Sequence, residues 1–189
     1  MRVLGIAGSP RRGGNTDILL NEVLEGAAGK GAAVKTIVLS RLKIAPCEHC
    51  DRCLETGRCE VKDDMQKVYD ELKWADRIAL ASPLHFMGVT AQTKAMIDRC
   101  QALWVRKYRL KLPPLDERER KGLFISVGGR KTANLFEPAL ATVKSFFRVL
   151  DITYAGELLF SGVDEKGAII KNPVALSQAF LAGQRLVEG

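Results

Sequence analysis

The fold class is decided by residues 2–16, which read RVLGIAGSPRRGGNT. The stretch begins with a short apolar run, residues 2–7, which predicts a buried strand rather than a signal peptide. A loop rich in glycine follows, and from Thr16 to Ala28 the apolar residues recur with helical spacing. A strand, a tight loop and a helix in this order form the beginning of a β-α series.

The rest of the chain repeats this alternation. Further strands are expected at residues 34–39, 77–81, 122–127 and 152–160. Further helices are expected at residues 64–74, 91–107 and 137–150 and from Asn172-Pro173 onward, with a loop at residues 110–120. Five β-α units in series predict an α/β domain whose parallel sheet is covered by helices on both faces. We expect residues 1–189 to form a single domain.

Composition narrows the class of protein. With 47% hydrophobic and 27% charged residues and no apolar run long enough to span a bilayer, a globular protein away from the membrane is expected. We expect it to be cytoplasmic, where thiols stay reduced. The net charge is +7, and positive side chains are concentrated at residues 106–111. This segment is expected to be either a solvated face or a contact for an acidic partner. No nucleic-acid recognition motif accompanies this segment.

The loop at residues 8–16 has the composition of an anion site. Its glycines let backbone amides approach a ligand, and Ser9, Asn15 and Thr16 add short polar side chains at a helix N-terminus. Arg11 or Arg12 adds positive charge. These features predict a phosphate site, although neither a Walker loop nor a dinucleotide G-x-G-x-x-G pattern is present.

Two further loops follow strands and should reach the same edge of the sheet, where α/β proteins bind ligands. Residues 82–90 mix apolar, aromatic and small side chains, a surface that suits a flat aromatic ring. His85 is expected to contact a ligand rather than to act as an acid or base. Gly128 and Gly129, after the fourth predicted strand, allow close backbone approach. A phosphate site beside a ring site fits flavin mononucleotide (FMN).

Four cysteines form the densest cluster of reactive groups. Cys47, Cys50, Cys53 and Cys59 have the spacing C-x2-C-x2-C-x5-C. Four thiolates suit a [4Fe-4S] cluster. Zinc is an alternative, although zinc sites more often pair two C-x2-C knuckles across a longer gap. Metal-free thiols or a disulfide are a third possibility. Cys100 stands apart and is expected to be a small core residue.

These motifs together resemble a known family. The Gly-Ser-Pro-Arg…Asn-Thr loop, the segment Ser-Pro-x-x-Phe-x-Gly-Val-Thr-Ala-Gln-x-Lys-Ala…Ile-Asp-Arg at residues 82–99 and the Gly-Gly turn resemble the flavodoxin-like NADPH-dependent FMN reductase superfamily. The cysteine stretch makes the chain similar to the iron–sulfur flavoproteins within it.

The resemblance implies a flavodoxin-like three-layer sandwich with strand order 2-1-3-4-5 and a cysteine-rich insertion at about residues 45–62. It implies an FMN phosphate bound by Ser9, Arg11, Asn15 and Thr16. The flavin ring would lie against residues of the second and third loops, namely Pro83, Leu84, His85, Phe86, Gly88, Gly128 and Gly129. A [4Fe-4S] cluster would be held by Cys47, Cys50, Cys53 and Cys59. Relatives often carry Tyr where this chain has His85.

The function implied is electron transfer from a one-electron donor such as ferredoxin, through the cluster, to FMN and on to a small acceptor. No catalytic residue beyond the cofactors is expected. A homodimer or homotetramer is expected, with the flavin near the subunit interface. The alternatives are an NAD(P)H-dependent FMN or quinone reductase without a cluster, and a flavodoxin-like binding module without enzymatic activity.

Overall fold

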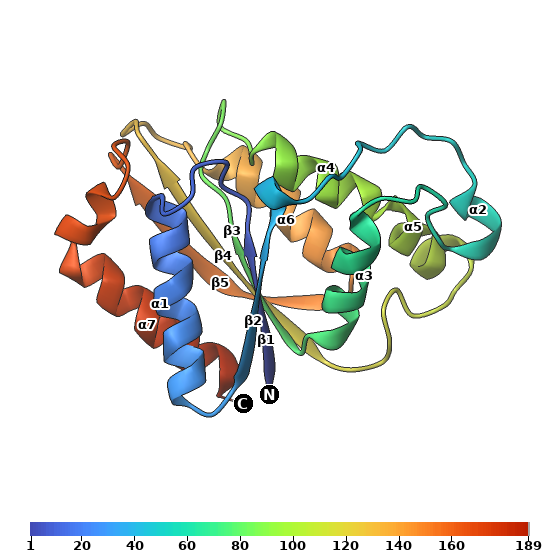
Figure 1. The fold of residues 1–189 in the computed structure, drawn as a ribbon, viewed down its shortest axis with the longest axis horizontal. Helices are drawn as coiled ribbons and strands as arrows, with labels where there is room; N and C mark the ends of the chain where they lie inside the picture. Colours follow the sequence, from blue (N-terminus) through green and yellow to red (C-terminus); the bar gives the residue numbers. More distant parts are fainter. Residues whose placement is uncertain (189) are drawn as a thin grey trace.

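The computed structural model describes residues 1–188, which form a five-stranded sheet between two layers of helices (Figure 1). The strands are β1 (Arg2–Ala7), β2 (Ala33–Val38), β3 (Arg77–Ala81), β4 (Arg120–Gly128) and β5 (Ile152–Ser161). Every pair of neighbours is parallel and the order is β2-β1-β3-β4-β5. The predicted fold class and strand order are therefore confirmed.

Two hydrophobic cores lie on the two faces of the sheet. Successive side chains of a strand point to opposite faces of the sheet, so alternate residues of each central strand pack into different cores. Val3 packs into one core and Leu4 into the other. One core is covered by α1 (Asn15–Gly29) and α7 (Pro173–Val187). The other is covered by α3 (Met65–Trp74), α4 (Ala91–Arg99) and α6 (Glu137–Val149).

Helices α1 and α7 touch through glycine. A Cβ atom added to Gly26 would lie 2.0 Å from the carbonyl oxygen of Phe180, and one added to Gly183 would lie 1.9 Å from that of Val23. The two helix backbones are therefore in direct contact, which holds α7 against the first β-α unit.

One predicted helix is wrong in its extent. The helix expected at residues 91–107 is broken at Cys100, and the chain continues through α5 (Gln101–Trp104) and the π-turn η2 (Val105–Arg109). The carbonyl of Arg99 accepts a hydrogen bond from the Tyr69 hydroxyl at 2.5 Å, which competes with helical pairing at this point. Cys100 is 3% exposed and lies in the core, as predicted.

Residues 42–64 form the predicted insertion between β2 and α3. They include the single-turn helix α2 (Cys53–Thr56), and in Figure 1 they run outward past α4 toward α5. Between residues 43 and 64, Gly57 alone is buried. The short helices η1 (Leu39–Arg41) and η3 (Ala168–Lys171) complete the described chain.

The loops that follow β1, β3, β4 and β5 gather at one edge of the sheet, at the top of Figure 1, away from both termini. Among residues 1–188, no helix combines the length and the apolar character that crossing a membrane requires.

Candidate flavin and cysteine sites

The loop between β1 and α1 is a tight turn organised by Ser9. Its hydroxyl oxygen accepts a hydrogen bond from the Arg11 amide and donates one to the Arg11 carbonyl, both at 3.1 Å. Gly13 has φ of +63°, which favours glycine. The loop leads directly into α1, whose first-turn amides lack intrahelical partners. This geometry suits an anion such as a phosphate.

Gly8 leaves no room for a side chain. A Cβ atom there would lie 2.0 Å from Thr93 Oγ1 and 2.9 Å from the Ala81 carbonyl oxygen. The Gly8 amide donates to Ala81 at 2.7 Å, and the Gly8 carbonyl accepts from Thr90 Oγ1 at 2.6 Å. The first and second loops are thus fastened to each other through their backbones.

Asn15 joins the first loop to the segment that follows β5. Its amide group donates to the Glu165 carbonyl at 2.9 Å, and its side-chain oxygen accepts from the Ile169 amide at 3.1 Å. Asn15 is therefore an organiser of the predicted phosphate loop. Of the four residues predicted to meet phosphate, Ser9, Asn15 and Thr16 are buried, and Arg11 is exposed.

Asp17 is a buried acid beside this loop that the sequence reasoning missed. Its carboxylate accepts from the Gly13 amide at 3.0 Å and forms an ion pair with Arg12 at 3.6 Å. Burial raises the pKa of Asp17, although Gly13, Arg12 and Lys166 oppose the rise. Arg12 is exposed as well but pairs with Asp17, whereas Arg11 is exposed and takes part in no ion pair among the described residues.

The second loop carries a two-residue hairpin. His85 and Gly88 exchange backbone hydrogen bonds at 3.0 Å, and the two residues between them, Phe86 and Met87, have φ of 51° and 63°. Positive φ at both central positions is the geometry of tight β-hairpin turns and is unusual without glycine. The hairpin leaves the Phe86 side chain fully exposed at the edge.

A cavity of ≈ 440 Å³ lies between the second and third loops. It is lined by Leu84, Phe86, Met87, Gly128, Gly129, Arg130 and Leu135. Four of these were predicted as flavin contacts; Met87, Arg130 and Leu135 were missed, although the first two adjoin predicted positions. Pro83, His85 and Gly88 belong to the same loop but not to this lining. The size and apolar walls of the cavity are ordinary for a small-molecule site.

The four predicted metal ligands, Cys47, Cys50, Cys53 and Cys59, line one pocket. All are free thiols, so the disulfide alternative is absent from the described chain. Burial raises the pKa of the Cys53 thiol, and the other three cysteines raise it further.

The donor set fits an iron–sulfur cluster, but the thiols are not arranged around a metal. Within residues 1–188, no three His, Cys, Asp or Glu side chains are grouped closely enough to hold an ion. The pocket that the four cysteines help to line has a volume of ≈ 30 Å³.

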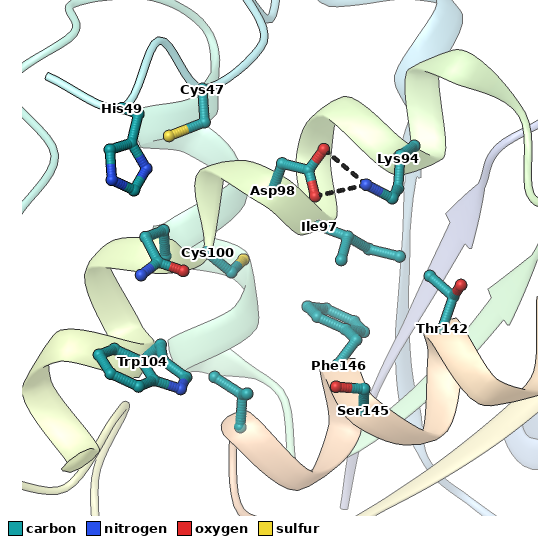
Figure 2. A pocket seen from close by; sticks show the side chains of 12 residues that line it. Cys47, His49, Lys94, Ile97, Asp98, Cys100, Trp104, Thr142, Ser145 and Phe146 are labelled. Carbon is teal, nitrogen blue, oxygen red and sulfur yellow. Dashed lines mark hydrogen bonds and ion pairs between the residues drawn. The ribbon is translucent and has the colours of Figure 1, made fainter.

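A second, larger cavity adjoins the cysteines (Figure 2). Its volume is ≈ 560 Å³, and Cys47 belongs to the walls of both cavities. His49 from the insertion, Trp104 from α5 and Phe146 from α6 contribute to it, and Figure 2 shows the Lys94–Asp98 ion pair of 2.8 Å on its rim. Sequence reasoning did not predict this cavity, which shares no lining residue with the flavin cavity.

Comparison with known proteins gives the family. The chain matches the NADPH-dependent FMN reductase family over residues 1–161. It belongs to this family. An iron–sulfur flavoprotein of Methanocaldococcus jannaschii is 38% identical over 157 residues, 82% of this chain and 75% of that protein. One of Archaeoglobus fulgidus is 38% identical over 145 residues, 77% and 70% of the two chains. The predicted resemblance is confirmed, and this family member is an FMN-dependent oxidoreductase.

Solved structures support the fold. An NAD(P)H:quinone oxidoreductase from Methanothermobacter marburgensis superimposes with a TM-score of 0.73 at 18% identity, covering 100% of this chain and 97% of that one. A flavone reductase gives 0.75 at 21% identity, and this chain spans 62% of its length. At these low identities, the two comparisons show only that the folds are similar.

Proposed function

We propose that this FMN reductase family member carries electrons from a one-electron donor, through a [4Fe-4S] cluster on its four clustered cysteines, to FMN and on to a small acceptor. The observation that carries the proposal is that Cys47, Cys50, Cys53 and Cys59 line one pocket although they span a poorly packed insertion. Relatives named iron–sulfur flavoproteins at 38% identity support it.

The chain's own residues would hold the flavin at the edge of the sheet. The first-turn amides of α1 and the exposed Arg11 would bind the phosphate. Leu84 and Leu135 would shield the ring from water in the apolar cavity, and Gly128 would let it approach the backbone. FMN, when bound, supplies the ability to accept electrons singly and release them in pairs.

Helix α4 connects the two proposed cofactor regions. At its N-terminus, Thr90 caps the helix and contacts Gly8 of the phosphate loop. At its C-terminal end, Arg99 lines the cysteine pocket. Nine helical residues span about 14 Å, so the two ends of α4 lie about this far apart.

The proposed donor is an acidic electron carrier such as ferredoxin. Arg106 packs over Gly57 of the insertion, where a Cβ atom would lie 2.3 Å from Arg106 Cγ. Arg109 and Lys111 of the same segment are exposed. Positive charge thus adjoins the cysteine pocket, which favours encounter with a negatively charged protein. We further propose a homodimer or homotetramer, to be tested by light scattering.

Anaerobic purification followed by iron and sulfide analysis tests the proposal. We expect about four irons per chain and a broad absorption shoulder beside the flavin bands. Less than about one iron per chain after reconstitution would rule the cluster out.

A second candidate is an NAD(P)H-dependent FMN or quinone reductase without a cluster. It is favoured by a relative from Bacillus subtilis, 25% identical over 95% of this chain, named a putative NAD(P)H-dependent FMN-containing oxidoreductase. Rapid anaerobic bleaching of bound flavin by NADPH, in a sample free of iron and ferredoxin, would favour this function.

A further inference from the structure

A buried arginine closes the base of the cysteine insertion. Arg99, at the end of α4, is 1% exposed and forms an ion pair with Asp63 at 2.6 Å. The same guanidinium donates to the carbonyl of Ala45 at 3.0 Å and to that of Val61 at 3.2 Å. Asp63 also accepts from the Ala45 amide at 2.9 Å. Residue 45 precedes the first clustered cysteine and residues 61 and 63 follow the last, so one side chain joins both ends of the loop.

One N–H donor of this guanidinium group forms no hydrogen bond among the described residues. This donor is Nε of Arg99, and it is buried. Leaving a buried donor unpaired is unfavourable, and more so when the group is charged. Burial lowers the pKa of Arg99, but Asp63 and then Cys59 outweigh it and raise the pKa above its ordinary value. Arg99 and Cys59 line the same pocket, so this thiol is the neighbour toward which the spare donor can act once it becomes a thiolate.

We propose that Arg99 is a positioning residue for the cysteine site, which closes the loop and raises the reduction potential of a cluster bound there by hydrogen bonding toward its sulfur atoms. The inference rests on the proposed cluster. When the oxidised cluster takes one electron from a one-electron donor, its charge falls by one and no proton needs to move. A fixed cation nearby stabilises the reduced form more than the oxidised form, and hydrogen bonds to the sulfurs act in the same direction.

Asp63 allows the electrostatic role to be separated from loop closure. Replacing Arg99 by Met leaves the Asp63 carboxylate uncompensated, whereas replacing Asp63 by Asn leaves the Arg99 cation uncompensated. Both changes weaken the base of the loop, but they change the local charge in opposite directions. Arg99→Lys keeps the positive charge but loses the forked guanidinium group that hydrogen-bonds to both ends of the loop.

The test uses the full chain with FMN bound, reconstituted anaerobically with iron and sulfide. The cluster's midpoint potential is measured by titration followed by electron paramagnetic resonance, and iron per chain is counted. We expect Arg99→Met to lower the potential, with at least a tenfold fall in the reduced-to-oxidised ratio at fixed donor potential, or about 59 mV for one electron. Asp63→Asn should raise it, and Arg99→Lys should load less iron at a near-native potential. Lys94→Met, an exposed charge on the same helix, is the matched control and should change neither.

The outcomes separate the two proposals. Loaded clusters whose potentials are unchanged, or move the same way in Arg99→Met and Asp63→Asn, overturn the role in setting the potential. Maleimide labelling of Cys59 in the iron-free, FMN-bound chain measures loop closure without the cluster. Equal labelling rates in the wild type and Arg99→Met overturn the closing role. A wild-type chain that takes up no iron defeats the proposed function and the potential-setting role with it, while the labelling result still decides loop closure.

Discussion

The phosphate loop and the cysteine insertion both leave the carboxyl edge of the sheet, but they are held in different ways. In residues 8–14, Gly8 is fixed by a backbone hydrogen bond to Ala81 of β3 and by one from the buried Thr90, and a Cβ atom on Gly8 would overlap Thr93 Oγ1. In residues 43–64, Gly57 alone is buried, and the two ends of the insertion are joined by Arg99 and Asp63. The phosphate loop is thus shaped by the fold, and the insertion is shaped chiefly at its base.

This difference predicts different responses to losing a cofactor. A preformed loop loses little order without its ligand, so the flavin site should keep its shape in the apoprotein. A loop with few buried groups has few contacts to order it, so the cysteine region should gain order from a bound metal centre. Substitutions in one region should therefore leave the other region's cofactor in place.

The largest effect is expected from Cys53→Ala. Removing one of four thiolate ligands should abolish the cluster and bring iron per chain close to zero. FMN binding should be unchanged within about twofold, because Cys53 shares no cavity with the flavin loops. Iron analysis and flavin fluorescence measure the two effects.

Cys100→Ala is the matched control for this change. Cys100 is a buried core thiol outside the set of four, so iron should be retained at a modest cost in stability. Loss of FMN together with iron in Cys53→Ala would show that the two regions are not independent.

The next largest effect is expected from Gly8→Val. Its side chain would overlap Thr93 Oγ1 and the Ala81 carbonyl, and overpacking of this kind costs about 1–3 kcal/mol or more. Flavin affinity should fall with stability, while iron uptake persists in the folded fraction. Gly29→Ala is the control, since nothing lies within 4 Å of its added Cβ atom. Urea unfolding and flavin titration give the measurements, and an unaffected Gly8→Val variant would contradict the proposed rigidity.

Thr90→Val tests the bond between the first two loops. The hydroxyl donates to Gly8, pairs with Thr93 Oγ1 at 2.9 Å and caps α4. Its loss leaves the buried Gly8 carbonyl unpaired, with an expected cost of about 1–3 kcal/mol. Thr90→Ser should recover most of this stability in thermal unfolding. Equal melting temperatures for the Val and Ser variants would indicate that packing, not the hydrogen bond, holds the loops together.

The strands and loops were predictable because their signals are local. Short apolar runs located all five strands to within two residues, and glycine with short polar residues located the phosphate loop. No local pattern marks the break at Cys100, and the hydrogen bond beside it, from Tyr69 to the Arg99 carbonyl, joins residues thirty apart in the sequence. The Arg99–Asp63 pair and the burial of Asp17 were missed for the same reason. Long-range polar contacts follow from tertiary packing and leave no periodic pattern in the sequence.

The smallest effect concerns acid stability at the base of the insertion. Burial raises the pKa of Asp63, but hydrogen bonds from Arg99, Ala45 and Met65 outweigh it and hold the pKa below its ordinary value. Because the folded pKa is the lower one, the unfolded chain binds more protons as the pH falls. The stability contributed by Asp63 is therefore fully present above the ordinary Asp pKa of about 4, and it is lost as the pH falls through the folded value.

Asp63→Asn should remove this part of the pH dependence. In urea unfolding between about pH 2.5 and pH 6, the variant should be less stable than the wild type at the upper end, and the two should converge at the lower end. Asp98→Asn, which removes an exposed partner of Lys94 on α4, is the matched control and should follow the wild-type profile closely. If Asp63→Asn ran parallel to the wild type at every pH, the ion pair would add nothing to the base of the insertion. The contrast with the backbone-held phosphate loop would then rest on packing alone.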